Sequence, residues 1–318
     1  MADHEYDVLI AGGGVAGLTA GLTAARAGRT TRVLTGPALG GNLLSIERID
    51  GYPGFPEGVP GYDLGPIIQE QAMAAGADFD SSEATGLQAA DGRWRVTTAG
   101  GDLLARAVVI ATGTTLKTLG IPGEERLKGK GVSHCASCDA PLMRGRTVAV
   151  VGGGDSALQE ALTLAQHVAR VIILHRGHEL SAQAAYAGPV REHSKIEVRF
   201  GTVVEEVLGD AGVTGVRVRN VADGTTGDLE VAGLFIYIGL APATAWLAGT
   251  LPVDASGRIL VDNEMRSGVP GLFAAGTVRS GSAGRAAAAA GDGAVAAVTA
   301  DRYLKGDMIR FERSMRTL

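Results

Sequence analysis

The stretch YDVLIAGGGVAGLTAGLTAARAGRTTRVLT, residues 6–35, decides the fold of this chain. An apolar strand comes first, a glycine loop follows it, and an Ala- and Leu-rich helix leads to a second strand. The loop places Gly12, Gly14 and Gly17 in the pattern G-x-G-x-x-G. In this pattern the first glycine permits the turn, the second lets the backbone approach a pyrophosphate, and the third lets the helix pack on the strand. Residues 6–35 therefore predict a dinucleotide-binding βαβ unit, and the alternative is a simple tight turn of an α/β protein.

Residues 147–175 repeat the plan, with strand TVAVVG, loop GGGDSA, a helix expected through about Val168, and strand RVIILH. Gly152, Gly154 and Ala157 form the variant G-x-G-x-x-A. The repeat predicts two dinucleotide domains in tandem, although a duplicated domain can keep its turn and lose its ligand. In the first copy Thr35 stands where an acidic residue usually meets the ribose, so we expect a different ribose contact there.

Later segments return to the first domain. AVVIATGT (107–114) and GLFAAGTV (271–278) each predict a buried strand that ends in a turn of small residues, and a long helix is expected from about 285 to 304. The Gly- and Pro-rich stretch 36–63 is expected to be a long ordered loop. The predicted fold is α/β, with two Rossmann-like, three-layer dinucleotide-binding domains. The first comprises residues 1–117 and 245–318, and the second, 118–244, is inserted in it.

Composition excludes several classes of function. The 318 residues carry a formal net charge of −5 and no basic run, so we expect neither nucleic acid nor an anionic membrane surface as a partner. The chain has no run of about 18 apolar residues, so no membrane span is expected. Its start, MADHEYD, does not resemble a secretory signal, so a cytoplasmic location is expected.

Cys135 and Cys138 form a C-A-S-C motif and are the only cysteines. A zinc site would need four ligands and only His134 is nearby, so no metal is expected. This spacing instead predicts a redox-active dithiol. Asp139 follows at once and is interpreted as a group that moves a proton to or from a thiol, or as a solvated turn residue. His134 has the same two interpretations, a proton carrier or an exposed neutral histidine.

Together with GGNL (40–43), GYPGFPEG (51–58), IGLAP, VPGLFAAG and AAGDGA, these motifs resemble the low-molecular-weight thioredoxin reductase family over nearly the whole chain. The resemblance implies a homodimer, rotation between domains, and a middle domain that carries the dithiol and a nicotinamide site at Gly152, Gly154, Asp155, Ser156, Ala157 and Arg176. By matching position, Cys138 would face the flavin, Cys135 would exchange with substrate, and Asp139 would be the acid/base. It also implies FAD at Gly12, Gly14, Val15, Ala16, Gly17, Thr35, Gly40, Gly41, Asn42, Leu43, Gly51, Ala111, Thr112, Gly113, Gly276, Thr277, Arg285 and Ala286.

The chain departs from the family at both nucleotide sites. The family's arginine-rich H-R-R-x-x-x-R reads HRGHELS here, so Gly177 and Ser181 replace two arginines and Arg176 remains. A 2′-phosphate needs dense positive charge, so efficient use of NADPH is not expected. At the flavin, Gly51 replaces an Asn, Thr277 an Asp and Ala286 a Gln. We still expect FAD to bind.

These losses fit the branch of the family that resembles gliotoxin- and holomycin-type enzymes. The leading hypothesis is a FAD-dependent oxidase that converts a small-molecule dithiol to a disulfide through Cys135 and Cys138 and passes the electrons to oxygen. The alternative is a NAD(P)H-dependent reductase of thioredoxin or a thioredoxin-like protein. A ferredoxin-linked reductase and a non-catalytic redox sensor are further hypotheses.

Overall fold

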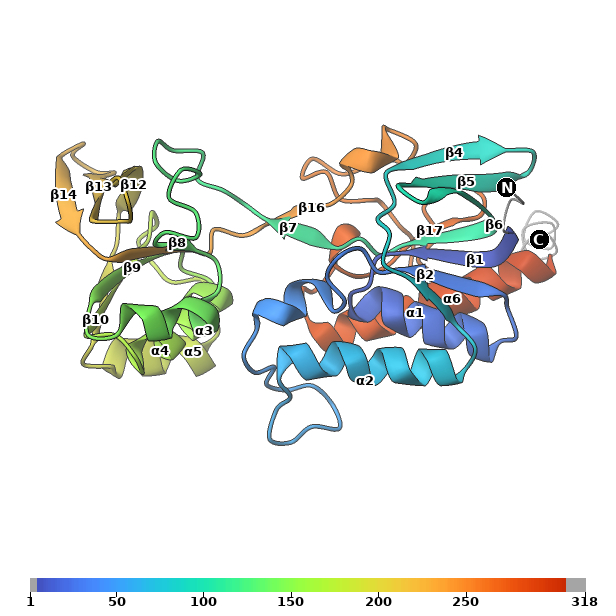
Figure 1. Cartoon of the computed structure of the whole chain (residues 1–318), viewed down its shortest axis with the longest axis horizontal. Helices are drawn as coiled ribbons and strands as arrows, with labels where there is room; N and C mark the ends of the chain where they lie inside the picture. Colours follow the sequence, from blue (N-terminus) through green and yellow to red (C-terminus); the bar gives the residue numbers. More distant parts are fainter. Residues whose placement is uncertain (1–4, 307–318) are drawn as a thin grey trace, which may run out of the picture. The chain divides into compact units, whose positions relative to one another are not determined.

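The computed structural model describes residues 5–306, which form two compact units. Unit 1 contains residues up to Thr115 and from Ala241 onward, and unit 2 is Leu116–Leu240. The chain leaves unit 1 through β7 (Thr114–Leu116) and returns through β16 (Leu240–Pro242). These two strands pair with each other in a two-stranded sheet (Figure 1).

Unit 1 is built on a seven-stranded sheet of order β3-β2-β1-β6-β5-β4, and β17 pairs with the remaining edge of β6. Strands β1, β2, β3, β6 and β17 run parallel, whereas β4, β5 and β6 form an antiparallel meander. The strands are β1 (Glu5–Ala11), β2 (Thr31–Leu34), β3 (Asp78–Asp80), β4 (Gly86–Ala90), β5 (Arg93–Thr98), β6 (Gly101–Ile110) and β17 (Leu272–Ala274).

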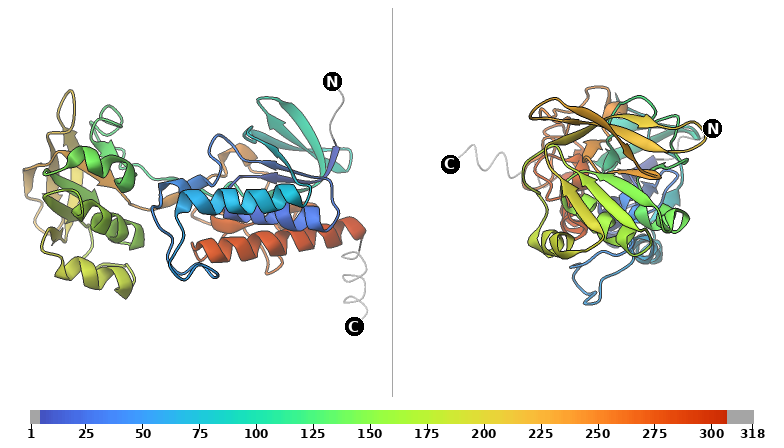
Figure 2. Two further views of the ribbon diagram at one scale, coloured as in Figure 1. Left: turned by 60° about the horizontal axis from the view of Figure 1, so that its bottom comes forward. Right: turned by 90° about the vertical axis from the view of Figure 1, so that its left-hand side faces the viewer.

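The sheet of unit 1 is buried on both faces. Side chains alternate along a strand, so Val8 and Ile10 of β1 pack under the helices while Leu9 and Ala11 enter the opposite core. Helices α1 (Val15–Arg26), α2 (Gly61–Ala74) and α6 (Ala286–Lys305) cover the first face (Figures 1 and 2). The second face is covered by β4, β5 and the segment around η3 (Ala245–Leu247), which gives three layers.

Unit 2 repeats this arrangement. Its parallel sheet has the order β11-β10-β9-β15-β8. Val148 and Val150 of β9 face the helices, and Ala149 and Val151 face a three-stranded antiparallel sheet. The elements are β8 (Val132–Ser133), α3 (Ala136–Asp139), η2 (Ala140–Met143), β9 (Thr147–Val151), α4 (Asp155–Ala165), β10 (Arg170–Leu174), α5 (Ala184–Glu192), β11 (Ile196–Arg199), β12 (Thr202–Leu208), β13 (Gly215–Asn220), β14 (Thr226–Glu230) and β15 (Gly233–Ile236).

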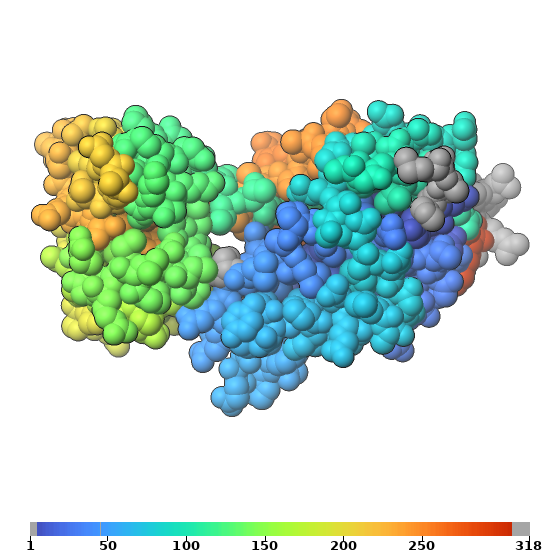
Figure 3. Space-filling view, viewed as in Figure 1, coloured from blue at the N-terminus to red at the C-terminus, as the bar shows by residue number. Residues whose placement is uncertain are grey.

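The predicted fold class, with two Rossmann-like units, is confirmed. Two local predictions were wrong. The expected loop 36–63 contains η1 (Gly41–Ser45) and ends at Gly61, where α2 begins. Part of the segment between them, residues 46–60, projects from unit 1 (Figure 3), while Val59 is buried. The helix expected through about Val168 ends at Ala165. Within residues 5–306 no helix is long and apolar enough to cross a membrane.

Candidate active site

The glycine loop between β1 and α1 leaves open space above Gly14. A Cβ on Gly12, whose φ is +123°, would lie 2.2 Å from the carbonyl oxygen of Ala111, and a Cβ on Gly17 would lie 1.8 Å from that of Gly12. A Cβ on Gly14 would meet no heavy atom within 4 Å. Helix α1 starts at Val15 with no side-chain cap and no acidic residue in its first turn. Its first N–H groups therefore suit a pyrophosphate.

Predicted flavin-site residues from three distant segments meet in unit 1. The Asn42 side-chain amide donates to the carbonyl oxygen of Thr114 (3.0 Å) and to its hydroxyl (3.1 Å). The Thr114 hydroxyl lies 3.3 Å from that of Thr277, and a Cβ on Gly113 would be 3.5 Å from the same Thr277 oxygen. The three segments follow the carboxyl ends of the parallel strands β2, β6 and β17. In open parallel sheets, ligands bind just beyond the carboxyl ends of the strands.

Most of the remaining predicted flavin residues lie in the same loops or pack against them. The Gly40 N–H donates to the Gly13 carbonyl oxygen (2.9 Å), and the Cα of Gly14 lies 3.8 Å from where a Cβ on Gly41 would be. Leu43 packs in one cluster with Val15 and Ala286. Gly51 is exposed within the segment 46–60, and a Cβ there would meet no heavy atom within 4 Å. The Ala111 N–H donates to the Ala11 carbonyl oxygen, and the Thr112 hydroxyl donates to the Ala243 carbonyl oxygen. Arg285 is the residue immediately before α6.

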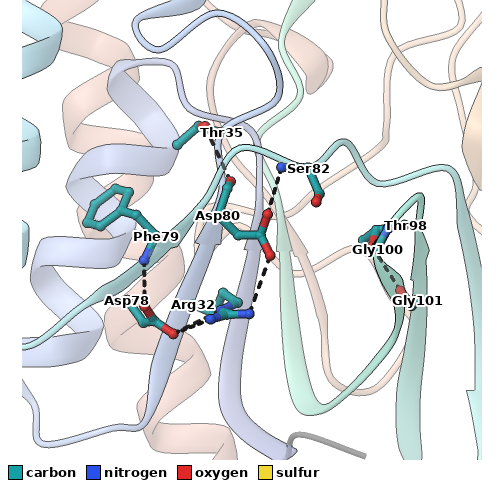
Figure 4. A network of polar contacts seen from close by, with 9 residues as sticks. All are labelled: Arg32, Thr35, Asp78, Phe79, Asp80, Ser82, Thr98, Gly100 and Gly101. Carbon is teal, nitrogen blue, oxygen red and sulfur yellow. Dashed lines mark hydrogen bonds and ion pairs between the residues drawn. The ribbon is translucent and has the colours of Figure 1, made fainter. Parts of the chain in front are cut away.

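Thr35 is held by the edge strand β3 (Figure 4). Its N–H donates to the Asp80 carbonyl oxygen (2.8 Å), and its hydroxyl lies within hydrogen-bond distance of the carbonyl oxygens of Gly36 and Asp80. Arg32 in turn bridges the carboxylates of Asp78 and Asp80. A Cβ on Gly13 would be 2.7 Å from Cβ of Thr35, so Thr35 lies against the glycine loop. Its contact with the ribose remains a prediction.

A buried ion pair supports the flavin loop, and the sequence analysis missed it. Asp292 of α6 is 6% exposed and receives two hydrogen bonds of 2.7 Å from Arg279. It also accepts the N–H of Gly276 (3.1 Å), whose Cβ, if present, would lie 2.8 Å from Cβ of Ala16. The pair therefore fixes residues 276–279 against the start of α1. An acidic residue inside the Ala-rich run of α6 was the signal that could have found it.

The observed glycine geometry, the open space at Gly14 and the uncapped helix fit FAD. Gly12, Gly14, Val15 and Ala16 would hold the pyrophosphate, and Asn42, Gly113 and Thr277 would lie toward the flavin end.

The second glycine loop, between β9 and α4, is closely packed as well, and its neighbours include a histidine ring. A Cβ on Gly152 would lie 2.3 Å from the Tyr237 carbonyl oxygen and 3.0 Å from Cβ of Ala157, and one on Gly153 would lie 2.4 Å from the His175 ring. Both the N–H and the hydroxyl of Ser181 donate to the Gly153 carbonyl oxygen (2.9 and 3.2 Å). Ser181 therefore fastens residues 177–181 to the loop.

The charges around this second loop differ from those at α1. Asp155 stands in the first turn of α4, and its carboxylate accepts hydrogen bonds from the backbone and side chain of Gln183 (2.7 and 2.5 Å). Ser156 is exposed beside it. Arg176 is exposed after β10, and Gly177 next to it offers no side chain. A negative charge at the helix start and a single arginine make this loop a weaker anion site than the first.

The two cysteines lie at the start of α3 and form a disulfide with a Cα–Cα distance of 5.4 Å. Cys135 caps the helix, and its sulfur accepts the N–H of Cys138 (3.3 Å) and lies 3.5 Å from the Ser137 hydroxyl. The Ser133 hydroxyl accepts the N–H of Cys135 (3.0 Å). Cys135 is half-buried and Cys138 is exposed, so the disulfide is accessible. The N–H and hydroxyl groups around Cys135 would stabilise a thiolate there.

Asp139 and His134 flank the disulfide, as predicted from their position in the sequence. Asp139 ends α3, is half-buried, and borders a surface cavity of about 250 Å³ that Lys130, Leu142 and Met143 also line. His134 Nδ1 lies 2.9 Å from the Ile236 carbonyl oxygen. Because a carbonyl only accepts, Nδ1 carries the proton of this hydrogen bond. His134 is half-buried, not exposed.

A buried carboxylate under the disulfide was also missed. Glu160 of α4 is 7% exposed, and its Oε2 accepts the N–H of Ala136 (3.2 Å) and the Tyr237 hydroxyl (3.4 Å). Burial raises the pKa of Tyr237 far above its usual range, and the negative charge of Glu160 raises it further. Tyr237 is therefore a proton donor throughout the working range of pH. An acidic residue on the apolar face of α4 was the only signal in the sequence.

Comparison with known proteins gives one consistent result. Residues 6–293 match the pyridine nucleotide-disulphide oxidoreductase family. The chain is 39% identical over 305 residues to a thioredoxin reductase of Treponema pallidum, covering 95% of this chain and 98% of that protein. It is 38% identical to a bifunctional thioredoxin reductase/thioredoxin of Mycobacterium leprae, covering 95% and 67%. The crystal structure of Lactococcus lactis thioredoxin reductase matches with 34% identity and a TM-score of 0.91, covering 95% of this chain and 99% of that one.

Proposed function

The chain belongs to the pyridine nucleotide-disulphide oxidoreductase family, and on this premise we propose that it reduces the disulfide of a thioredoxin-like protein with electrons from a nicotinamide nucleotide. It is a FAD-dependent disulfide oxidoreductase of the thioredoxin reductase type. The names of its relatives favour the reductase over the oxidase that the sequence led us to expect. One relative joins a thioredoxin reductase and a thioredoxin in a single chain, which supports a thioredoxin-like partner.

The observation that carries the proposal is the accessible Cys135–Cys138 disulfide at the start of α3, with Asp139 on the same turn. FAD, when bound, supplies two-electron transfer between a nicotinamide and this disulfide. The cavity beside Asp139 and the exposed side chain of Leu142 offer a protein substrate a surface next to the sulfurs.

The two cysteines act in sequence once they are reduced. The Cys135 thiolate, stabilised by the Cys138 N–H, attacks the substrate disulfide; a Cys135–substrate bond forms and the substrate's S–S bond breaks. The substrate thiolate that leaves takes up a proton, and Asp139 is the nearest acid by position. Cys138 then attacks Cys135, restores the disulfide and releases the second substrate thiol. Two electrons and two protons pass to the substrate.

We propose that the enzyme uses NADH at least as efficiently as NADPH to drive this cycle. Arg176 is the one arginine in residues 175–181, Ser181 is bonded to the Gly153 carbonyl oxygen, and Asp155 stands at the helix start. A 2′-phosphate adds about two negative charges that a single exposed arginine only partly neutralises.

The test follows the flavin absorbance of the purified holoprotein under anaerobic conditions. NADH, NADPH and a small dithiol are added in turn, and reduction of a thioredoxin is measured in parallel. Rapid bleaching by a nucleotide together with thioredoxin reduction is expected. Bleaching by the dithiol alone, with neither nucleotide effective, would refute the reductase and support the second candidate.

The second candidate is the small-molecule dithiol oxidase, in which electrons flow from a substrate dithiol through Cys135 and Cys138 to the flavin and then to oxygen. The weakened positive charge at the second glycine loop favours it, because an oxidase needs no nucleotide. It predicts oxygen consumption that matches the dithiol consumed. The homodimer expected from the family resemblance is part of both proposals.

A further inference from the structure

Glu160 places a buried carboxylate directly behind the redox disulfide. Its Oε2 lies 3.2 Å from the N–H of Ala136, which is fully buried and follows Cys135 in the chain. The same oxygen accepts the Tyr237 hydroxyl at 3.4 Å. Glu160 lies on α4, Tyr237 follows β15, and the cysteines begin α3, so three elements of unit 2 meet at this one oxygen.

The groups that can act on the sulfurs come from every element packed around α3. Asp139 ends α3 itself, His134 follows β8, Glu160 comes from α4, and Tyr237 follows β15. Asp139 is half-buried and borders the surface cavity, and His134 is half-buried. Glu160 is the carboxylate that both is buried and bonds to α3. Charge effects are strongest for groups withdrawn from water, so the charge of Glu160 should be little screened by solvent.

We propose that Glu160 is a positioning residue for the dithiol: it holds α3 through the Ala136 N–H, and its negative charge opposes the contacts that stabilise a Cys135 thiolate, so the thiolate fraction is lower than it would be without Glu160. The Ala136 N–H, which follows Cys135 in the chain, donates to Glu160 and is therefore not available to a thiolate. Tyr237 donates to the same oxygen and so partly offsets its charge. The proposal rests on Cys135 and Cys138 being the redox pair, which both candidate functions share.

The test measures the rate of alkylation of each cysteine in the reduced protein against pH, read out peptide by peptide with mass spectrometry. Glu160→Gln keeps a hydrogen-bond acceptor for Ala136 and removes the charge. We expect its alkylation profile to move down by about one pH unit, which is about a tenfold higher thiolate fraction at a pH below the thiol pKa. Glu192→Gln, which removes an exposed charge from α5, should leave the profile unchanged.

Tyr237→Phe is the second variant, because it removes the donor and keeps the ring. The Glu160 charge is then less offset, so the profile should move upward, by less than the Glu160→Gln shift. A role in stability alone would lower the midpoint of unfolding and leave both profiles in place. Profiles of the two variants that superimpose on the wild type would overturn the proposal. Alkylation needs neither nucleotide nor thioredoxin, so this result is independent of the test of the proposed function.

Discussion

Replacing two glycines of the first loop separates flavin binding from folding. Gly14 has φ −78° and ψ 178°, which any residue adopts, and a Cβ there meets nothing within 4 Å. Gly14→Ala should therefore leave the apoprotein about as stable as the wild type, because a gain of about 0.4–1 kcal/mol from the less flexible unfolded chain is offset by the lower preference of Ala than of Gly for the N-cap position. Gly17→Ala instead puts a Cβ 1.8 Å from the Gly12 carbonyl oxygen, and relieving this clash should cost about 3 kcal/mol or more.

The effect on FAD follows from the open space above Gly14. A methyl group there occupies the position from which a pyrophosphate would reach the first N–H groups of α1. Hydrogen bonds to charged groups contribute about 1.5–3 kcal/mol each, so losing one or two of them should weaken FAD binding about a hundredfold. Gly188→Ala is the matched control, because Gly188 lies in α5 of unit 2 and also has open space around it.

The assay titrates FAD into each apoprotein, follows the quenching of flavin fluorescence, and measures urea unfolding of the same samples. Gly14→Ala should lose affinity and keep its stability, Gly17→Ala should lose both, and Gly188→Ala should change neither adversely. Wild-type affinity in Gly14→Ala would mean that the pyrophosphate does not lie over the start of α1, and the assignment of this loop would be wrong.

Three further predictions test the ion pairs and the nucleotide. Arg279→Met leaves a buried carboxylate unpaired, so urea unfolding should show a loss of about 3–5 kcal/mol, against about 0.5 kcal/mol or less for Arg302→Ala at the surface; equal losses would contradict this. Arg176→Ala should raise the KM for NADPH about tenfold and change that for NADH less than twofold, in steady-state kinetics; equal changes would show that Arg176 does not contact the 2′-phosphate. Burial alone would raise the pKa of Asp301, but hydrogen bonds from two basic side chains outweigh it and hold the pKa below its usual value. The stabilisation of the folded state by Asp301 is therefore complete above about pH 4 and is lost as pH falls through the folded-state pKa. Asp301→Asn should lower the free energy of unfolding by about 1 kcal/mol at pH 7 and by far less near pH 2. A loss that does not depend on pH would exclude this cause.

The parallel sheets could be predicted because their signals are local. Val8 and Ile10 enter one core while Leu9 and Ala11 enter the other, which is why the strand reads as a continuous apolar run. In the loop that follows β1, close backbone contacts require glycine at fixed positions, so the spacing of the glycines can be read from the sequence. Strands β4, β5 and β12–β14 were not predicted, because they are partly exposed and none reads as a continuous apolar run.

Gly61 shows why the boundary of α2 was missed. In the sequence it stands in a Gly- and Pro-rich run that indicates a loop. In the structure it is the first residue of α2, and a Cβ there would lie 2.0 Å from the Leu43 carbonyl oxygen. Glycine serves here for close packing, not for a turn, and the two uses look the same in a sequence.

The candidate site was predictable where its chemistry lies in a motif and not where it depends on tertiary contacts. Cys135, Cys138 and Asp139 are adjacent in the chain, so their grouping needed no structure. Glu160 and Tyr237 are 77 residues apart and meet under α3 only after the sheet of unit 2 has formed. No spacing rule relates such residues.

Unit 1 is interrupted in the sequence, and this affects its synthesis on the ribosome. Residues 116–240 contain all of unit 2 and emerge before β17 and α6 exist. Until residue 274 has been made, β6 has one edge open where β17 will pair, and until residue 305 has been made, the α1 side chains that pack against α6 lack that contact. Unit 2 should therefore fold first during translation. A nonsense codon ahead of Leu272 would release a product in which the disulfide unit is folded while the amino-terminal segment exposes apolar surface to chaperones and proteases.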